Sequence, residues 1–430
     1  MRFASTRGQA PAVGIDMALQ AGLAPDGGLY VPESIPALAG IAAGGSLAQT
    51  AQQLLAPFFD GSRLQARLPA LCGHAFSFDA PLVALRGDGD HLLELFHGPT
   101  AAFKDYAARF LAGCLATLRN DDEPPRTIVV ATSGDTGAAV AAAFHGMPGF
   151  RVAILYPHGR VSPRQAHGLE CWGGNVRAFR VEGSFDDCQR MAKAVLGDAR
   201  LREELWLTSA NSISLGRLLP QAAYHAHAAL QFHATQAQPL NLIVPTGNLG
   251  NAAAAWLARA MGAPIGEIAL ACNANDTLPR FFGGGEYAPA STIPTLANAM
   301  DVAAPSNFER LRHWFGDDDA ALRAAFRAWT VDDAAIRAGI AAAPDRHGVV
   351  ACPHTACGLH VLEALRAAGD TRPWAVAATA HPAKFEAIVE PLLGHAIALP
   401  PALADCLARP AHGEPLAAEA VRLVDALRDG

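Results

Sequence analysis

Short apolar runs rich in β-branched residues alternate along the chain with Ala-rich stretches of helical spacing, and Gly-rich turns separate the two. The pattern predicts strands at 127–132, 151–157, 176–183, 240–246, 267–273 and 374–380. Strands that are apolar on both faces and alternate with helices are typical of parallel sheets covered on both sides. Ligands of such sheets bind beyond the carboxyl ends of the strands.

Composition narrows the class of protein. Of the 430 residues, 51% are hydrophobic and 17% are charged, which is typical of a packed globular chain. The net charge of −7 argues against a nucleic-acid-binding protein, and no apolar run is long enough for a membrane span. The N-terminus lacks an apolar signal-like region, and the eight cysteines are widely spaced, so we expect a cytoplasmic protein with reduced thiols and no metal site.

Two Gly-rich turns follow predicted strands and are candidate anion sites. In "PTGNLGN", Gly247 and Gly250 would let backbone amides approach an anion at a helix N-terminus, although an ordinary tight turn explains the motif equally well. In "TSGDTG", the hydroxyls of Ser133 and Thr136 add to the amides. Two such turns predict ligands with at least two anionic groups.

Lys104 is one of only three lysines, against 30 arginines. It stands in "ELFHGPTAAFKDYAARFLAG", where apolar residues from Phe103 to Leu118 recur at helical spacing and place the lysine in the first helical turn. The helix dipole disfavours a cation there, and partial burial would lower the pKa of the amine further. A neutral amine is a nucleophile, and arginine cannot replace it. Lys384 follows another strand, whereas Lys193 is expected on the surface.

A lysine for an aldehyde and a separate cradle for a phosphate are the two groups that pyridoxal phosphate requires. Besides the lysine segment and the "TSGDTG" turn, five further segments of the chain support this interpretation. The chain resembles the threonine synthase family in "STRG", "GLAPDGGLYVP", "ELFHGPTAAFKD", "TSGDTGAAV", "NDTLPRF", "ANAMDV" and "TAHPAKF", which occur in the family's order over nearly the whole length.

The resemblance implies the fold and the site residues. The fold would be α/β, of the fold type II pyridoxal phosphate enzymes: two lobes of twisted, mostly parallel sheet covered by helices, with an N-terminal helical addition. Lys104 would form a Schiff base with the cofactor, and Thr379 would face its pyridine nitrogen. Residues implied to surround the cofactor phosphate are Gly247, Asn248, Leu249, Gly250 and Asn251. Candidates for the carboxylate and phosphate of the substrate are Ser133, Asp135, Thr136, Asn211, Ser212, Arg217 and Lys384.

The implied reaction converts O-phospho-L-homoserine and water into L-threonine and phosphate. A related phospho-lyase, a serine or threonine dehydratase, and a non-catalytic relative of the same fold are the alternatives. Three positions depart from the family: Leu249 stands where phenylalanine is usual, Thr246 where serine is frequent, and Ser214 where asparagine is common. A cradle built from backbone amides tolerates the first two.

The expected organisation has five parts. They are an N-terminal mostly helical segment at 1–80, the cofactor-lysine segment at 81–125, a smaller α/β lobe at 126–205, a large α/β lobe at 206–395 and a C-terminal helical tail at 396–430. We expect a monomer or homodimer whose partner is its small-molecule substrate.

Overall fold

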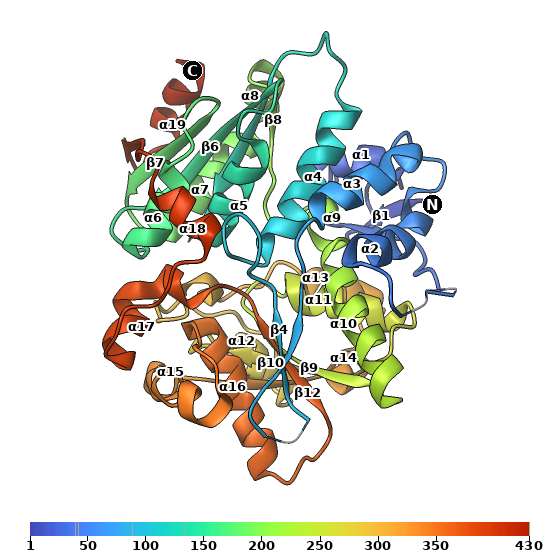
Figure 1. Ribbon diagram of the computed structural model, residues 1–430. Coiled ribbons are helices and arrows are strands. Elements are labelled where there is room, and N and C mark those ends of the chain that lie inside the picture. The colour runs from blue at the N-terminus through green and yellow to red at the C-terminus, as the bar shows by residue number, and fades with distance from the viewer. Residues whose placement is uncertain (39, 42, 88, 133, 430) are drawn as a thin grey trace.

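The computed structural model describes residues 1–38, 40–41, 43–87, 89–132 and 134–429, which form two lobes, each built on its own sheet (Figure 1). The smaller lobe has five parallel strands in the order β13-β7-β6-β5-β8. Its strands are β5 (Arg126–Ala131), β6 (Phe150–Pro157), β7 (Val176–Glu182), β8 (Leu207–Thr208) and β13 (Gly413–Ala417). Its helices are α5 (Asp135–Phe144), α6 (Pro163–Glu170), α7 (Phe185–Gly197), α8 (Ala199–Glu204) and α19 (Ala420–Arg428).

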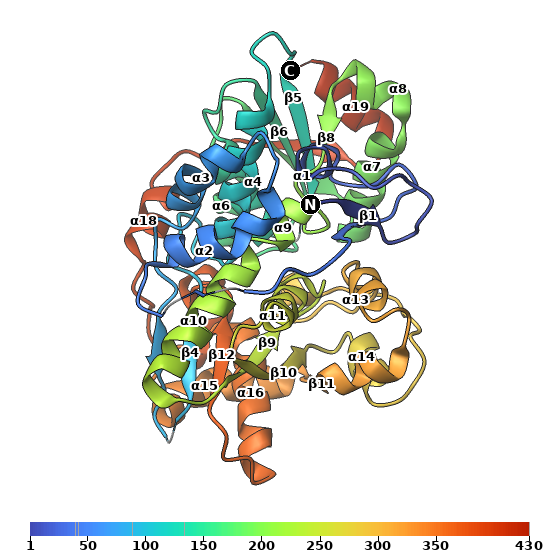
Figure 2. The same cartoon turned by 90° about the vertical axis from the view of Figure 1, so that its right-hand side faces the viewer.

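The larger lobe has six strands in the order β11-β10-β9-β12-β4-β3, and only β3 runs antiparallel to its neighbour. Its strands are β3 (Leu82–Ala84), β4 (His91–Glu94), β9 (Leu240–Pro245), β10 (Ile265–Cys272), β11 (Phe326–Thr330) and β12 (Trp374–Ala378). Helices α10 (Gln221–Gln236) and α11 (Gly250–Ala260) lie on the opposite side of this sheet from α15 (Asp333–His347) and α16 (Pro353–Ala367) (Figures 1 and 2). Smaller helices are α12 (Thr277–Phe282), α13 (Phe308–Trp314), α14 (Asp319–Ala325) and α17 (Glu386–Leu393).

The N-terminal segment packs against α4 (Lys104–Leu118) and α10. It consists of the antiparallel pair β1 (Phe3–Ser5) and β2 (Tyr30–Pro32) with α1 (Ile15–Ala21), α2 (Leu47–Leu55) and α3 (Leu68–Ala75). The remaining elements are α9 (Leu215–Leu218), α18 (Pro401–Leu407) and the 3₁₀ turns η1 (Ala56–Phe59), η2 (Gln65–Arg67), η3 (Asn298–Met300) and η4 (Pro382–Phe385). In these described ranges, no helix has both the length and the apolar character needed to cross a bilayer.

All six strands expected from the sequence are present, as β5, β6, β7, β9, β10 and β12. Successive residues of β5 show why the run is apolar throughout. Ile128 and Val130 belong to the central core, while Val129 and Ala131 pack into a second core under α7 and α19. Because side chains alternate between the faces of a strand, burial on both faces requires apolar residues at every position.

The tail beyond Leu393 crosses from one lobe to the other. Its helix α18 packs on α6, and β13 then pairs with β7 at the edge of the smaller sheet. This strand was not expected from the sequence, which suggested only helices there. "GEPLA" contains a proline and a glycine, and both residue types are uncommon in strands except at sheet edges.

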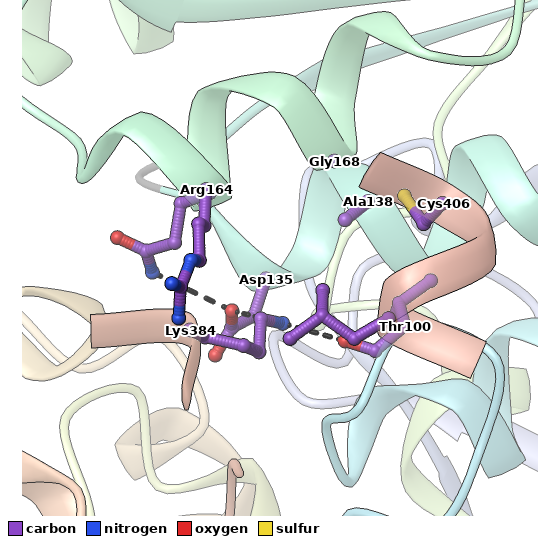
Figure 3. A pocket seen from close by; sticks show the side chains of 10 residues that line it. Thr100, Asp135, Ala138, Arg164, Gly168, Lys384 and Cys406 are labelled. Atoms are coloured by element: carbon purple, nitrogen blue, oxygen red, sulfur yellow. Dashed lines mark hydrogen bonds and ion pairs between the residues drawn. The ribbon is translucent and has the colours of Figure 1, made fainter. Parts of the chain in front are cut away.

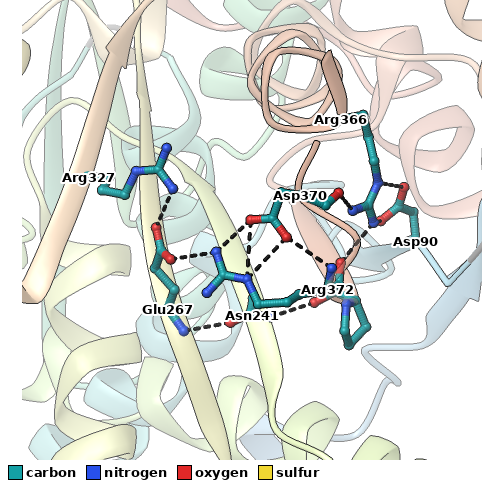
Figure 4. Close-up of polar contacts among 8 residues, drawn as sticks. Asp90, Asn241, Glu267, Arg327, Arg366, Asp370 and Arg372 are labelled. Carbon is teal, nitrogen blue, oxygen red and sulfur yellow. Dashed lines mark hydrogen bonds and ion pairs between the residues drawn. The ribbon is translucent and has the colours of Figure 1, made fainter. Parts of the chain in front are cut away.

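A polar network lies at the amino-terminal edge of the larger sheet (Figure 4). Glu267 pairs with Arg327 at 3.0 Å and with Arg372 at 2.8 Å. The buried Asn241 accepts a hydrogen bond from the Glu267 amide at 2.7 Å and donates to the Pro373 carbonyl at 2.8 Å. Asn241 therefore joins three neighbouring strands at the edge opposite the Gly-rich turns.

Candidate active site between the two lobes

Lys104 is the first residue of α4, which confirms the expected placement in the first helical turn. Burial lowers the pKa of its amine to about 8, and the cations Arg217 and Lys384 add to this effect while Asp135 opposes it. Within the described residues, no hydrogen-bond or ion-pair partner is recorded for Nζ; the Phe103 ring lies 5.5 Å away. A substantial minority of the amine is therefore neutral near physiological pH, far more than for an ordinary lysine, and this neutral form is available as a nucleophile.

Local hydrogen bonds hold the turn that leads into α4. Asp105 is fully buried, and its carboxylate accepts hydrogen bonds from the Thr100 amide at 2.8 Å and from the Thr100 hydroxyl at 2.6 Å. The Phe103 amide donates to the Thr379 carbonyl at 2.9 Å, which ties the residue before Lys104 to the end of β12. Lys104 is thus positioned from both sides, and Thr379, 6% exposed, lies beside it at the carboxyl end of a central strand.

Lys384 forms an ion pair across the two lobes. Its Nζ lies 2.7 Å from Oδ1 of Asp135, the first residue of α5, and donates to the Thr100 carbonyl at 2.7 Å (Figure 3). Both side chains are almost fully buried. Burial alone would raise the pKa of Asp135, but Lys384, Lys104 and His354 together hold it far below its usual value. The carboxylate therefore stays ionised, and two of the chain's three lysines share one site.

A small cavity adjoins this ion pair. Its walls come from Thr100, Asp135 and Lys384, from Arg164 and Gln165 on α6, and from Cys406 on α18 (Figure 3). Arg164 donates to the Ala383 carbonyl at 2.8 Å and pairs with Glu390, so it also bridges the lobes. Sequence reasoning did not identify Arg164 or Gln165, because nothing in the helical stretch "PRQAHGLE" distinguishes them from surface residues.

The "GNLGN" turn links β9 to α11. Leu249 adopts a left-handed conformation with φ of 60° and buries its side chain completely, so only its backbone can face a ligand. A Cβ on Gly247 would lie 2.7 Å from the Met300 backbone, so only glycine fits there. The "ANAMDV" segment therefore forms the outer wall of the turn.

Asn251 and Arg217 carry donors that suit an anion. The Asn251 side chain is buried in the first turn of α11, where Tyr224 and His225 bond its oxygen, while its Nδ2 has no partner among the described residues. Arg217 is also buried. It donates from Nη1 to the Ala210 carbonyl at 2.6 Å and leaves Nε unpaired within the same described ranges. Backbone amides, a helix N-terminus and the unpaired Nδ2 of Asn251 fit the phosphate of pyridoxal phosphate, and Arg217 offers a separate donor for a second anion.

The remaining predicted residues lie near the "GNLGN" turn and Asp135, except Ser133, which cannot be placed. Asn248 donates to the Ser212 hydroxyl at 2.6 Å, which brings the loop holding Asn211 and Ser212 against the turn. Thr136 follows Asp135 on α5 and is partly exposed. Ser133, proposed as a substrate ligand, lies outside the described residues. Ser214 is buried and its hydroxyl lacks a partner in the part of the chain that the structure describes.

A reactive lysine, an amide cradle and a hydroxyl at the end of a central strand define a class, the pyridoxal-phosphate dependent enzymes. The family model with the description "Pyridoxal-phosphate dependent enzyme" matches residues 81–382. The models "Threonine synthase N terminus" and "Threonine synthase, C-terminal" match residues 2–76 and 355–427. The chain belongs to the threonine synthase family.

Relatives and solved structures agree over almost the entire chain. The chain is 39% identical to the threonine synthase of Haemophilus influenzae and 37% identical to that of Escherichia coli, covering 91% of each chain in both comparisons. The crystal structure of the Escherichia coli threonine synthase matches with a TM-score of 0.91 at 34% identity, covering 100% of both chains. A pyridoxal phosphate-bound threonine synthase from Brucella melitensis matches with a TM-score of 0.90 at 35% identity, covering 100% of this chain and 99% of that one.

More distant structures share only the fold. Maize serine racemase, for example, matches with a TM-score of 0.53 at 17% identity, covering 79% of this chain and 94% of that one. The sequence-based predictions of the family, the fold class, threonine synthase activity and the pyridoxal phosphate cofactor are confirmed.

Proposed function

We propose that the chain converts O-phospho-L-homoserine and water into L-threonine and inorganic phosphate, with pyridoxal phosphate held between the lobes. The observation that carries this proposal is the position of Lys104. An amine with a pKa of about 8 lies close enough to Asp135, Lys384 and Arg217 for their charges to shift that pKa. A nucleophilic amine surrounded by anion-binding groups suits a phosphorylated amino-acid substrate.

Three parts of the chain would hold the cofactor. Lys104 would bond to the aldehyde carbon, the backbone amides of residues 247–251 and Nδ2 of Asn251 would bind the phosphate, and the Thr379 hydroxyl would face the pyridine nitrogen. When bound, pyridoxal phosphate supplies a delocalised system that stabilises negative charge developing on the substrate carbons. A neutral hydroxyl, unlike a carboxylate, leaves the ring nitrogen largely unprotonated.

Two buried cations, Lys384 and Arg217, would bind the anionic groups of the substrate. Lys384 is held against Asp135 in the cavity between the lobes, and we assign it to the substrate phosphate. Arg217 has an unpaired buried Nε in the described structure and suits the carboxylate. The hydroxyls of Ser133, Thr136 and Ser212 and the Asn211 amide would supply further donors.

Lys104 would also move protons. Its neutral Nζ would accept a proton from Cα of the bound substrate and return one during the later steps. A second deprotonation at Cβ accompanies loss of phosphate from Cγ, and water then adds at Cβ after Cγ is reprotonated. Positioned proton transfer of this kind typically contributes a factor of roughly 10² to 10⁴ in rate.

The test is incubation of the full chain with pyridoxal phosphate and O-phospho-L-homoserine, with assay of phosphate and of the organic product. We expect equal amounts of phosphate and L-threonine. Release of 2-oxobutyrate in place of threonine would identify a phospho-lyase, and no turnover would indicate a non-catalytic relative. Lys104→Ala should abolish turnover and should prevent borohydride from attaching the cofactor to the protein.

The same proposal includes the setting of the enzyme. We infer a cytoplasmic location, supported by cysteine thiols that are free and buried in the described structure, and a monomeric or homodimeric state. We retain the division at residues 80, 125, 205 and 395 as a working description of the segments. Light scattering on the purified chain measures the oligomeric state directly.

A further inference from the structure

A fully buried arginine lies behind the Gly-rich turn. Arg310 on α13 donates from Nε to the Tyr30 carbonyl at 3.2 Å, from Nη2 to the Ile213 carbonyl and from Nη1 to the Asn307 side-chain oxygen. Among the residues that the structure describes, no carboxylate pairs with it. A buried cation without an anionic partner is costly, and burial lowers the pKa of Arg310 to about 9.

Asn307 connects this cation to the turn. Its Nδ2 donates to the Asn248 carbonyl at 2.9 Å, while its oxygen accepts from Arg310. The neighbouring amide of Ser306 donates to Oδ1 of Asn248 at 2.6 Å, and Asn248 in turn donates to Ser212. The second residue of "GNLGN" is therefore held through both its backbone and its side chain by the segment that carries Arg310.

The N-terminal segment holds the other side of α13. Glu309 accepts hydrogen bonds from the Thr6 hydroxyl at 2.6 Å and from Nε of Arg7 at 3.3 Å, both in the "STRG" motif. Tyr30, whose carbonyl accepts from Arg310, lies in the "GLAPDGGLYVP" motif. These motifs lie far from the Gly-rich turn in sequence, and both reach it through α13.

We propose that Arg310 is a positioning residue for the cofactor phosphate, acting through Asn307 to orient the Gly247–Asn251 turn and supplying a buried positive charge behind it. The proposal rests on the proposed function, in which this turn binds the phosphate. A dianionic phosphate in the turn would provide the negative charge that the buried guanidinium lacks. Hydrogen bonds that involve a charged group contribute most where water is excluded.

The experiment compares two ligands of the full chain after its cofactor has been removed. Pyridoxal phosphate and pyridoxal share the aldehyde that reacts with Lys104, and only the first carries the phosphate. Dissociation constants from absorbance titration therefore give a ratio that isolates the contribution of the phosphate. We expect Arg310→Gln to reduce this preference for pyridoxal phosphate by about 10- to 100-fold with pyridoxal affinity unchanged, and Arg310→Lys to restore part of it.

Arg312→Gln is the matched control, because Arg312 lies on the same helix and pairs with Asp319, away from the turn. Its ligand preference should equal that of the wild type. Asn307→Ser interrupts the connection without removing the buried charge, so it tests the proposal if the Arg310 variants do not fold. It should also reduce the preference.

Each outcome has one meaning. If the wild type binds both ligands equally, the proposed function of the turn is wrong. If the wild type prefers pyridoxal phosphate and the variants keep that preference, or lose affinity for both ligands equally, Arg310 has only a structural role and the inference is overturned.

Discussion

The three lysines differ in their surroundings. Lys104 and Lys384 lie close enough for their charges to interact, although 279 intervening residues separate them in sequence, whereas Lys193 is exposed on α7. Arginine would remain protonated at position 104, so it could not supply a neutral amine there. The scarcity of lysine in an arginine-rich chain thus agrees with the proposed chemistry at Lys104, whereas Lys384 acts as a cation.

The lowered pKa of Lys104 predicts its chemical reactivity. Only the neutral amine reacts with an electrophile, and its fraction rises as the pH increases through the pKa. In cofactor-free protein we therefore expect labelling of Lys104 by a small aldehyde and cyanoborohydride to reach half its maximum near pH 8, after correction for the reagent's own pH dependence. Peptide mass spectrometry resolves the three lysines, and a midpoint above pH 10 would contradict the burial argument.

Lys384 is predicted to affect the substrate more than the cofactor. Lys384→Ala removes a buried cation from the cavity at Asp135 and should raise KM for O-phospho-L-homoserine about 10- to 100-fold, as expected for loss of a charged hydrogen bond. Cofactor occupancy, measured from visible absorbance, should remain near that of the wild type. Lys193→Ala on exposed α7 is the control and should change neither quantity. Equal losses of occupancy and substrate affinity would assign Lys384 to the cofactor.

At the scale of elements, the larger sheet uses its two edges differently. Its carboxyl edge carries the turns after β9 and β12, which supply the cradle and Thr379. Its amino edge carries Asn241 and the arginine–carboxylate network, where most charged groups already have partners (Figure 4). We assign stability to the amino edge and chemistry to the carboxyl edge, as is usual for parallel sheets.

Asn241→Ala tests this division. It leaves the Glu267 amide without its partner, while the Pro373 carbonyl keeps only the bond from the residue 241 backbone amide, so it should lower the free energy of unfolding by about 1–3 kcal/mol. Urea titration measures the change, and kcat of the folded enzyme should stay the same. Asn120→Ala, an exposed loop position, should change stability by less than about 0.5 kcal/mol. A lower kcat with unchanged stability would mean that the two edges are coupled.

At the scale of the whole molecule, one central core joins both lobes and two outer cores cover the far faces of the sheets. The central core includes Val130 of β5 and Val244 of β9, so it spans both sheets. One outer core lies under α16, and the other lies under α7 and α19. The tail that carries α19 therefore completes the smaller lobe after the chain has left the larger one.

Leu423→Ala should loosen only the smaller lobe's outer core. Leu423 is fully buried on α19, and such a truncation typically costs about 2–5 kcal/mol. We expect faster amide hydrogen exchange in β7 and unchanged exchange in β12 of the larger lobe. Val421→Ala, on the exposed face of the same helix, is the control and should leave both unchanged. Faster exchange in β12 as well would show that the cores unfold together.

Local sequence determined six of the strands and indicated most of the candidate site. Apolar β-branched runs identified β5 and β9, because burial on both faces excludes polar residues along the whole strand. Glycines directly after those strands identified the turns, since backbone can approach a ligand only where side chains are absent. Lys104 was identified by its rarity and its place at a helix start, which are both properties of the sequence.

Tertiary structure alone decided which distant groups meet. The Lys384–Asp135 pair, the cavity walls from Arg164, and the path from Arg310 to the Gly-rich turn depend on which strands are neighbours and how the lobes face each other. The edge strand β13 likewise exists through its pairing with β7. Hydrophobic periodicity encodes burial within a segment and carries no information about the partner, so these contacts could not be predicted from local patterns.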